Sequence, residues 1–261
     1  KFLELAEVAS GDKNLGAMSK RYDGGERSAD FLLSYYGVLS DVYEEGKAAQ
    51  VSGEYLEMLD DWSSTETLEM LIASPGPLGG KRMTYLLNHA DDAIATGGSE
   101  FVGNVEKAII NQYMEDNEAE ELPTIDQISN YYKEKAGGMT MRLAAHYPLF
   151  LAQQHRDKDA YLAGVLGYYS KFESDNPYEL NSIAWMVFES SEDQADLKTA
   201  LGWAKKSVDI EASYPNMDTL AWLYQKTGDK KMAKETAMKA IEMAKADGQD
   251  YSETEKILEE K

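Results

Sequence analysis

Residues 215–244, PNMDTLAWLYQKTGDKKMAKETAMKAIEMA, predict two short helices joined by a tight turn. In the first half, apolar and aromatic residues recur at i, i+3, i+4 and i+7, the spacing that places side chains on one helical face. Gly228 and Asp229 interrupt that spacing, as is typical just past a helix end. In the second half, a stripe of small residues favours close approach of the two helices. The two stripes consist of Met217, Leu220, Ala221 and Tyr224, and of Ala233, Ala237, Ala240, Ile241 and Ala244.

A second copy of this hairpin precedes the first, in the segment NSIAWMVFES…LKTALGWAKKSV. Placing Ala184 on Ala221 gives a step of 37 residues and brings further residues of like kind into register. The matched pairs are Ile183 with Leu220, Trp185 with Trp222, Ala200 with Ala233 and Ala204 with Ala237. Duplication predicts an array of helical hairpins, an architecture that presents extended binding surfaces and is not in itself an activity.

This unit resembles the tetratricopeptide repeat, which is about 34 residues long. The match is best in residues 215–244, and residues 43–56 look like the second-helix half of another repeat. The family's proline after the second helix is missing after Ala244, and residues 61–140 give no clean match. The resemblance implies an all-α fold, a right-handed superhelix (solenoid) of antiparallel helix hairpins. The matching positions are Leu220, Ala221, Tyr224, Gly228, Ala233 and Ala240.

The rest of the chain also predicts helices, about a dozen in all, and no alternating strand pattern. Residues 1–10 and 14–22 favour short helices, and residues 82–95 favour a helix that ends at Gly97 and Gly98. Ser28 is the predicted N-cap of a helix that ends at a turn formed by Glu45 and Gly46. The residues expected to face inward from that helix are Leu32, Leu33, Tyr36, Leu39 and Tyr43.

An acidic stretch, residues 115–121, is followed by Pro123 and predicts an exposed connector. We therefore expect a degenerate helical-repeat half in residues 1–121. A second half in residues 122–261 would carry the clear repeats and a polar C-terminal capping helix. One continuous solenoid is the alternative.

Composition excludes several classes of function. The chain has 26 basic and 47 acidic residues, a net charge of −21, which argues against binding nucleic acid or anionic lipid. It has no cysteine, which excludes disulfides, thiol nucleophiles and cysteine-ligated metals. No run approaches the ~20 apolar residues of a membrane span, so we expect no membrane insertion.

Chemical motifs are absent as well. There is no phosphate-binding G-x-x-x-x-G-K-[ST], no H-E-x-x-H and no G-x-S-x-G. His89 lies near Asp91 and Asp92, a conceivable metal site, although a histidine without such a role is the simpler interpretation. An enzyme with an acidic active site is the least favoured hypothesis. We predict no catalytic residue, no metal and no cofactor.

In a stacked array the first helices line the concave side. Trp185 and Trp222 each follow a small packing residue by one position and are therefore predicted to face that groove. The alternative is that both pack against the neighbouring hairpin. The clamp type of tetratricopeptide groove is poorly matched, since Asp218 and Trp222 stand where cations or asparagine are wanted. The predicted groove residues are Asn181, Trp185, Phe188, Glu189, Asp218, Trp222, Gln225 and Lys226.

The leading functional hypothesis is a non-enzymatic scaffold that binds a protein or peptide segment. The second comes from three segments: KFLELAEVAS, RYDGGERSADFLLSYYGVL and LAWLYQKTGDKKMAKE. They resemble the helical region that follows a thioredoxin-like domain in some Gram-negative bacterial proteins. This resemblance implies a helical appendage of a thiol-disulfide oxidoreductase whose catalytic domain lies upstream of Lys1. It also implies a periplasmic location; otherwise we expect a cytoplasmic one.

Overall fold

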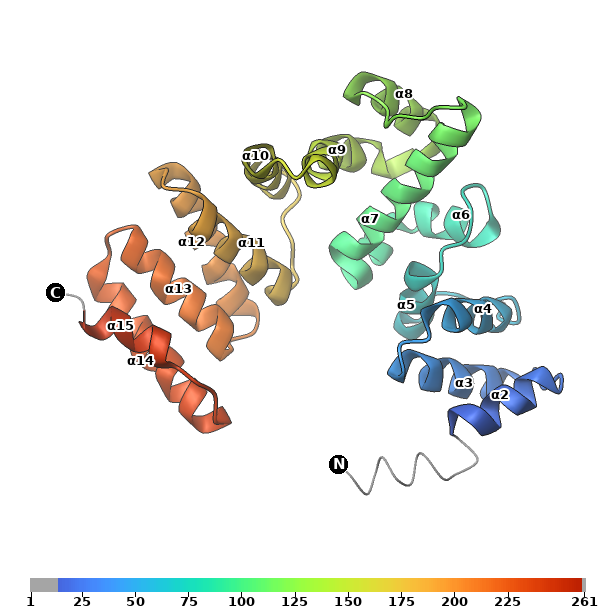
Figure 1. The fold of residues 1–261 in the computed structure, drawn as a ribbon, viewed down its shortest axis with the longest axis horizontal. Helices are drawn as coiled ribbons and strands as arrows, with labels where there is room; N and C mark the ends of the chain where they lie inside the picture. The colour runs from blue at the N-terminus through green and yellow to red at the C-terminus, as the bar shows by residue number, and fades with distance from the viewer. Residues whose placement is uncertain (1–13, 260–261) are drawn as a thin grey trace. The chain divides into compact units, whose positions relative to one another are not determined.

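A computed structural model describes residues 14–259 (Figure 1). Across these residues the protein is all-α, with fourteen α-helices and one short 3-10 helix. Most helices pack against their neighbours in sequence. The helix predicted for residues 1–10 lies outside the described residues. Within residues 14–259, no helix is long and apolar enough to cross a membrane.

The contacts between residues divide the chain into two compact units. Unit 1 spans Lys1–Leu122 with Ala136–Gly138, and unit 2 spans Pro123–Lys135 with Met139–Lys261. In its described part, unit 1 contains α2 (Leu15–Asp23), α3 (Ala29–Asp41), α4 (Glu45–Leu56), α5 (Thr65–Ala73), α6 (Lys81–Asn88) and α7 (Ala90–Asp116). Unit 2 contains α8 (Ile125–Lys135), α9 (Thr140–His155), α10 (Lys158–Tyr169), α11 (Pro177–Ser190), α12 (Gln194–Ile210), α13 (Tyr214–Lys226), α14 (Lys230–Asp247) and α15 (Ser252–Glu259). The 3-10 helix η1 spans Gly137–Met139.

The α3–α4 hairpin forms a predicted helix pair but turns earlier than expected. Helix α3 ends at Asp41, and α4 already contains Gly46, so the turn predicted at Glu45 and Gly46 was wrong. The turn occupies residues 42–44, where Tyr43 has a left-handed φ of 61°. Because the chain has left the helix by then, Tyr43 is not part of the inward stripe and is 86 % exposed.

The inward face of α3 agrees with the prediction in part. Leu32 and Leu39 are buried and Tyr36 packs half-buried against the same cluster, as predicted, but Leu33 is exposed. The aromatic residues that face the core of unit 1 are Phe31 and Tyr35, which stack with their ring centroids 5.8 Å apart. Met18 of α2 and Val51 of α4 complete this buried cluster.

Two breaks interrupt the segment that follows α5. The helix predicted over residues 82–95 is divided at His89, where α6 ends and α7 begins. The predicted break at Gly97 and Gly98 is confirmed in the backbone, because Gly98 has non-helical angles (φ 50°, ψ −131°) inside α7. At Gly97 there is no room for a side chain, since a Cβ there would lie 2.7 Å from Cδ1 of Ile72. Helix α7 therefore approaches α5 closely and changes direction at this point.

Unit 2 contains the two hairpins predicted from the repeat, α11–α12 and α13–α14, as neighbouring antiparallel helices (Figure 1). Their predicted small residues are fully buried, which allows the close packing of the two helices of each hairpin. The turn between α13 and α14 uses Gly228 with φ 90°, and Asp229 caps α14 by accepting from the Met232 N–H. The buried alanines are Ala184, Ala200, Ala204, Ala221, Ala233, Ala237, Ala240 and Ala244.

Helix α15 packs on both α13 and α14. Its Ile257 is fully buried in the core of unit 2, and its Thr254 is fully buried as well. The short helix therefore covers part of the α13–α14 hairpin.

Candidate binding groove

The eight predicted groove residues come from α11 and α13, which contact each other directly. Seven of them are half-buried, and Glu189 is exposed. Most of them form three local arrangements. These are an aromatic row, a lysine that joins the two helices, and two polar side chains, one in the N-terminal half of each helix.

The aromatic row consists of Trp185, Phe188 and Trp222. Trp185 and Phe188 stack with ring centroids 4.8 Å apart, and Phe188 lies 6.1 Å from Trp222 across the two helices. Phe188 and Trp222 also pack against the buried core of unit 2. Each aromatic pair stabilises the fold by about 0.5–1.5 kcal/mol beyond its buried area. The rings thus rest on the neighbouring hairpin and still keep part of their surface in solvent.

Lys226 joins the end of α13 to the end of α11. Its Nζ donates to the Phe188 carbonyl oxygen at 2.7 Å, pairs with Glu192 at 2.8 Å and lies 5.1 Å from the Phe188 ring centroid. A cation is favoured at this position because the last carbonyls of a helix carry partial negative charge. The ammonium group is therefore already engaged within the chain and contributes to packing of α11 on α13.

Asp218 is half-buried and is hydrogen-bonded to α15. Its Oδ1 accepts from the Thr254 hydroxyl at 2.6 Å, and it also accepts from the Trp222 side chain. The Thr254 hydroxyl lies 3.0 Å from that of Tyr214, which extends the network. Burial raises the pKa of the Asp218 carboxyl, and the two hydrogen bonds only partly oppose this shift.

Asn181 is the residue of α11 that corresponds to Asp218 by the repeat. Its Oδ1 is buried and has no hydrogen-bond partner within residues 14–259. A buried acceptor without a partner costs about 1–3 kcal/mol, and such groups in folded proteins call for a specific explanation. Of the two corresponding polar side chains, Asp218 is therefore hydrogen-bonded, whereas the Asn181 oxygen is unsatisfied within residues 14–259.

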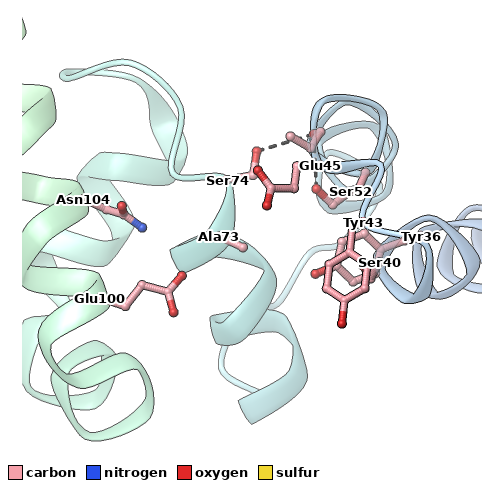
Figure 2. A pocket seen from close by; sticks show the side chains of 11 residues that line it. Tyr36, Ser40, Tyr43, Glu45, Ser52, Ala73, Ser74, Glu100 and Asn104 are labelled. Atoms are coloured by element: carbon pink, nitrogen blue, oxygen red, sulfur yellow. Dashed lines mark hydrogen bonds between the residues drawn. The ribbon is translucent and has the colours of Figure 1, made fainter. Parts of the chain in front are cut away.

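A second concavity, which the sequence did not indicate, lies in unit 1 (Figure 2). It has a volume of about 420 Å³ and is lined by α3, α4, the end of α5 and α7. Its residues are dispersed between Tyr36 and Asn104 and share no motif, so only the folded chain brings them together.

His89 has a structural role. Its Nδ1 donates to the Tyr85 carbonyl oxygen at 2.9 Å, and its ring stacks on that of Tyr85 with centroids 4.1 Å apart. Over the described part of the chain, no group of three or more histidine, cysteine, aspartate or glutamate side chains is arranged to hold a metal ion.

Comparison with known proteins gives no family. No family model matches the chain, and no curated protein matches it. The resemblances to the tetratricopeptide repeat and to the helical region of thioredoxin-like proteins therefore stay predictions.

Proposed function

We propose that this chain is a non-enzymatic binding module that holds a protein or peptide segment along α11 and α13. In this proposal the hairpins of unit 2 form a right-handed, tetratricopeptide-like superhelix with the first helix of each hairpin on the concave side. The observation that carries the proposal is the aromatic row, Trp185–Phe188–Trp222, which spans two successive hairpins and remains half-exposed. Half-exposed aromatic side chains held by a core are favoured anchors at protein interfaces.

The chemistry around the row indicates what kind of segment fits. Lys226 is engaged by Glu192 and a backbone carbonyl, so it is not available to hold a terminal carboxylate. The neighbouring exposed charge is Glu189, and the whole chain carries −21. We therefore expect an apolar segment with neutral or basic flanks, whose large side chain packs on Trp185.

The test is selection of peptides from a displayed random library on the full chain, followed by affinity measurements on variants. Trp185→Ala is expected to weaken the affinity for the selected peptides by about tenfold or more, the effect typical of an interface hot-spot residue. Tyr178→Ala is the matched control, because Tyr178 is a 67 % exposed aromatic residue on the same helix but outside the row. Circular dichroism spectra of both variants check that α11 still folds.

Two results would contradict the groove assignment. One is that the library yields no peptide that binds above background. The other is that selected peptides bind Trp185→Ala and the unaltered chain equally well, since the row would then not be the contact surface.

A further inference from the structure

The Trp222 ring of the aromatic row is held by a carboxylate on its own helix. Asp218 precedes Trp222 by four residues on α13, and its carboxylate accepts a hydrogen bond from the Trp222 side chain. Side chains at this spacing meet on one helical face, and a helical side chain leans over the turn that precedes it. The bond therefore selects one orientation of the indole among those that its side-chain torsions allow.

The preceding hairpin lacks this restraint. Asn181 stands four residues before Trp185 on α11, but the Asn181 side-chain oxygen has no hydrogen-bond partner within residues 14–259. An indole N–H can only donate, so the Trp185 ring is not held by the residue one turn before it. Of the two tryptophans that the sequence alignment pairs, only Trp222 is therefore fixed by its preceding turn.

Helix α15 holds the same carboxylate. The Thr254 hydroxyl donates to Asp218 Oδ1 at 2.6 Å and lies 3.0 Å from the Tyr214 hydroxyl. Thr254 is fully buried and its acceptor is an acid, two conditions that strengthen a hydrogen bond relative to one in water. The position of α15 is thus linked to the orientation of the Trp222 ring through one carboxylate.

The placement of α15 does not depend on this bond alone. Ile257 is fully buried in the core of unit 2, and the Lys234 ammonium of α14 donates to the Leu258 carbonyl oxygen at 3.3 Å. Removal of the Thr254 hydroxyl should therefore leave α15 on the hairpin, so the bond to Asp218 can be tested separately from the fold.

We propose that Asp218 is a positioning residue of the aromatic row: with the Thr254 hydroxyl of α15, it holds the Trp222 ring in the orientation that a bound segment contacts. The inference rests on the proposed function, because it assigns a role at the same surface. It adds that affinity depends on α15, a helix outside the two aligned hairpins.

The first measurement needs no peptide. Nuclear magnetic resonance spectra of the isotope-labelled full chain contain one indole N–H signal for each of the four tryptophans, assigned by replacing each in turn with phenylalanine. Asp218→Leu removes the acceptor and Thr254→Val removes only the hydroxyl. Both should shift the Trp222 signal and speed exchange of its proton with solvent. The Trp62 signal should not move, because its indole donates to the Leu56 carbonyl oxygen in unit 1.

The second measurement uses the peptides selected for Trp185-dependent binding. Asp218→Leu should weaken their affinity about tenfold and Thr254→Val about threefold, the range expected for loss of hydrogen bonds. Thr254→Ser keeps the hydroxyl and should bind within about twofold of the unaltered chain. Ile257→Val is the matched control, because it destabilises the same helix without removing the bond and should change neither the Trp222 signal nor the affinity.

Three results would overturn the positioning role. One is a Trp222 signal that neither variant moves. Another is a signal that moves while Trp185-dependent peptides bind Asp218→Leu as tightly as the unaltered chain. The third is an equal loss of affinity in Ile257→Val, which indicates a general effect of helix stability. Failure of the proposed function is distinct, since no Trp185-dependent peptide is then found at all, and the positioning role fails with it.

Discussion

Among single residues, Asn181 and Asn216 of unit 2 provide a contrast. Asn216 is buried and fully bonded: its Oδ1 accepts from the Ser213 N–H, and its Nδ2 donates to the Ser207 hydroxyl and to the Glu211 carbonyl. Asn181 has a buried oxygen without a partner. The same residue type therefore contributes to stability at position 216 and opposes it at position 181.

This contrast predicts opposite effects of the same truncation. Asn181→Ala should leave the free energy of unfolding within about 0.5 kcal/mol of the unaltered chain, or raise it by up to about 1 kcal/mol. Asn216→Ala should lower it by about 2–4 kcal/mol, because three hydrogen bonds of a buried side chain are lost and one of the partners, Ser207, is itself buried. Urea denaturation measures both. Equal destabilisation by the two variants would show that the Asn181 amide is satisfied in solution.

Asp218 predicts a pH dependence of stability. Its pKa is raised above the usual 3.8 by burial, so the folded chain holds this proton more tightly than the unfolded chain. Its contribution to stability is therefore present below pH 3.8 and is lost as the pH rises through the raised pKa. Asp218→Asn keeps an acceptor for Thr254 but does not titrate, so its stability relative to the unaltered chain should increase across that range.

Asp250 is a control because its pKa shift has the opposite direction. Hydrogen bonds from Ser252 lower the pKa of the Asp250 carboxyl. Its contribution is present above pH 3.8 and is lost as the pH falls through the lowered pKa. Asp250→Asn should therefore lose stability relative to the unaltered chain as the pH rises. If the Asp218 and Asp250 variants change in the same direction in urea titrations at several pH values, the assignment of Asp218 to a buried network is wrong.

At the scale of helices, two glycines of α7 predict opposite effects of substitution by alanine on stability, because only one of them lies in a close helix contact. A Cβ at Gly97 would lie 2.7 Å from Ile72 Cδ1 and 3.0 Å from Ile72 Cγ2, in the buried contact with α5. Gly97→Ala should therefore destabilise the protein by about 1–3 kcal/mol. Gly103, in the same helix, has open space around it, so Gly103→Ala should stabilise by up to about 1 kcal/mol. Thermal unfolding distinguishes the two; a Gly97→Ala variant as stable as Gly103→Ala would mean that α5 and α7 are not in tight contact.

The sequence predicted the structure best where a helix packs on the next helix in the chain. The alanine stripes of residues 215–244 predicted the α13–α14 hairpin because their spacing alone determines which side faces the partner helix. It was less informative at helix ends. Leu39 and Tyr43 keep a spacing of four, which suggests one continuous face, but α3 stops at Asp41 and Tyr43 turns outward.

The contacts of the residues predicted to line a groove could not be derived from the sequence. The sequence alignment of the two hairpins placed Trp185 and Trp222 at equivalent positions, and both are half-buried. It could not reveal that Asp218 is hydrogen-bonded to α15, because the Thr254 hydroxyl comes from a segment outside the aligned hairpins. The unit 1 pocket depends on four helices and on the direction of α7 after Gly98, and no local spacing encodes that.

For the whole molecule, the dominant electrostatic property is the net charge of −21. Self-repulsion of that size opposes compaction and is screened by salt, whereas exposed ion pairs such as Lys231–Glu235 contribute little. The urea midpoint should therefore rise when NaCl is increased from about 10 mM to about 500 mM, a range over which the Debye length falls severalfold. A midpoint that falls with salt would show that attractive pairs outweigh the repulsion.

The exposed turn of Tyr43 has a practical consequence. A large aromatic side chain at the tip of a hairpin, in a short non-helical segment, is the kind of position at which proteases nick folded chains. Chymotrypsin, which cleaves after aromatic residues, should cut there before it reaches the buried tyrosines of α3.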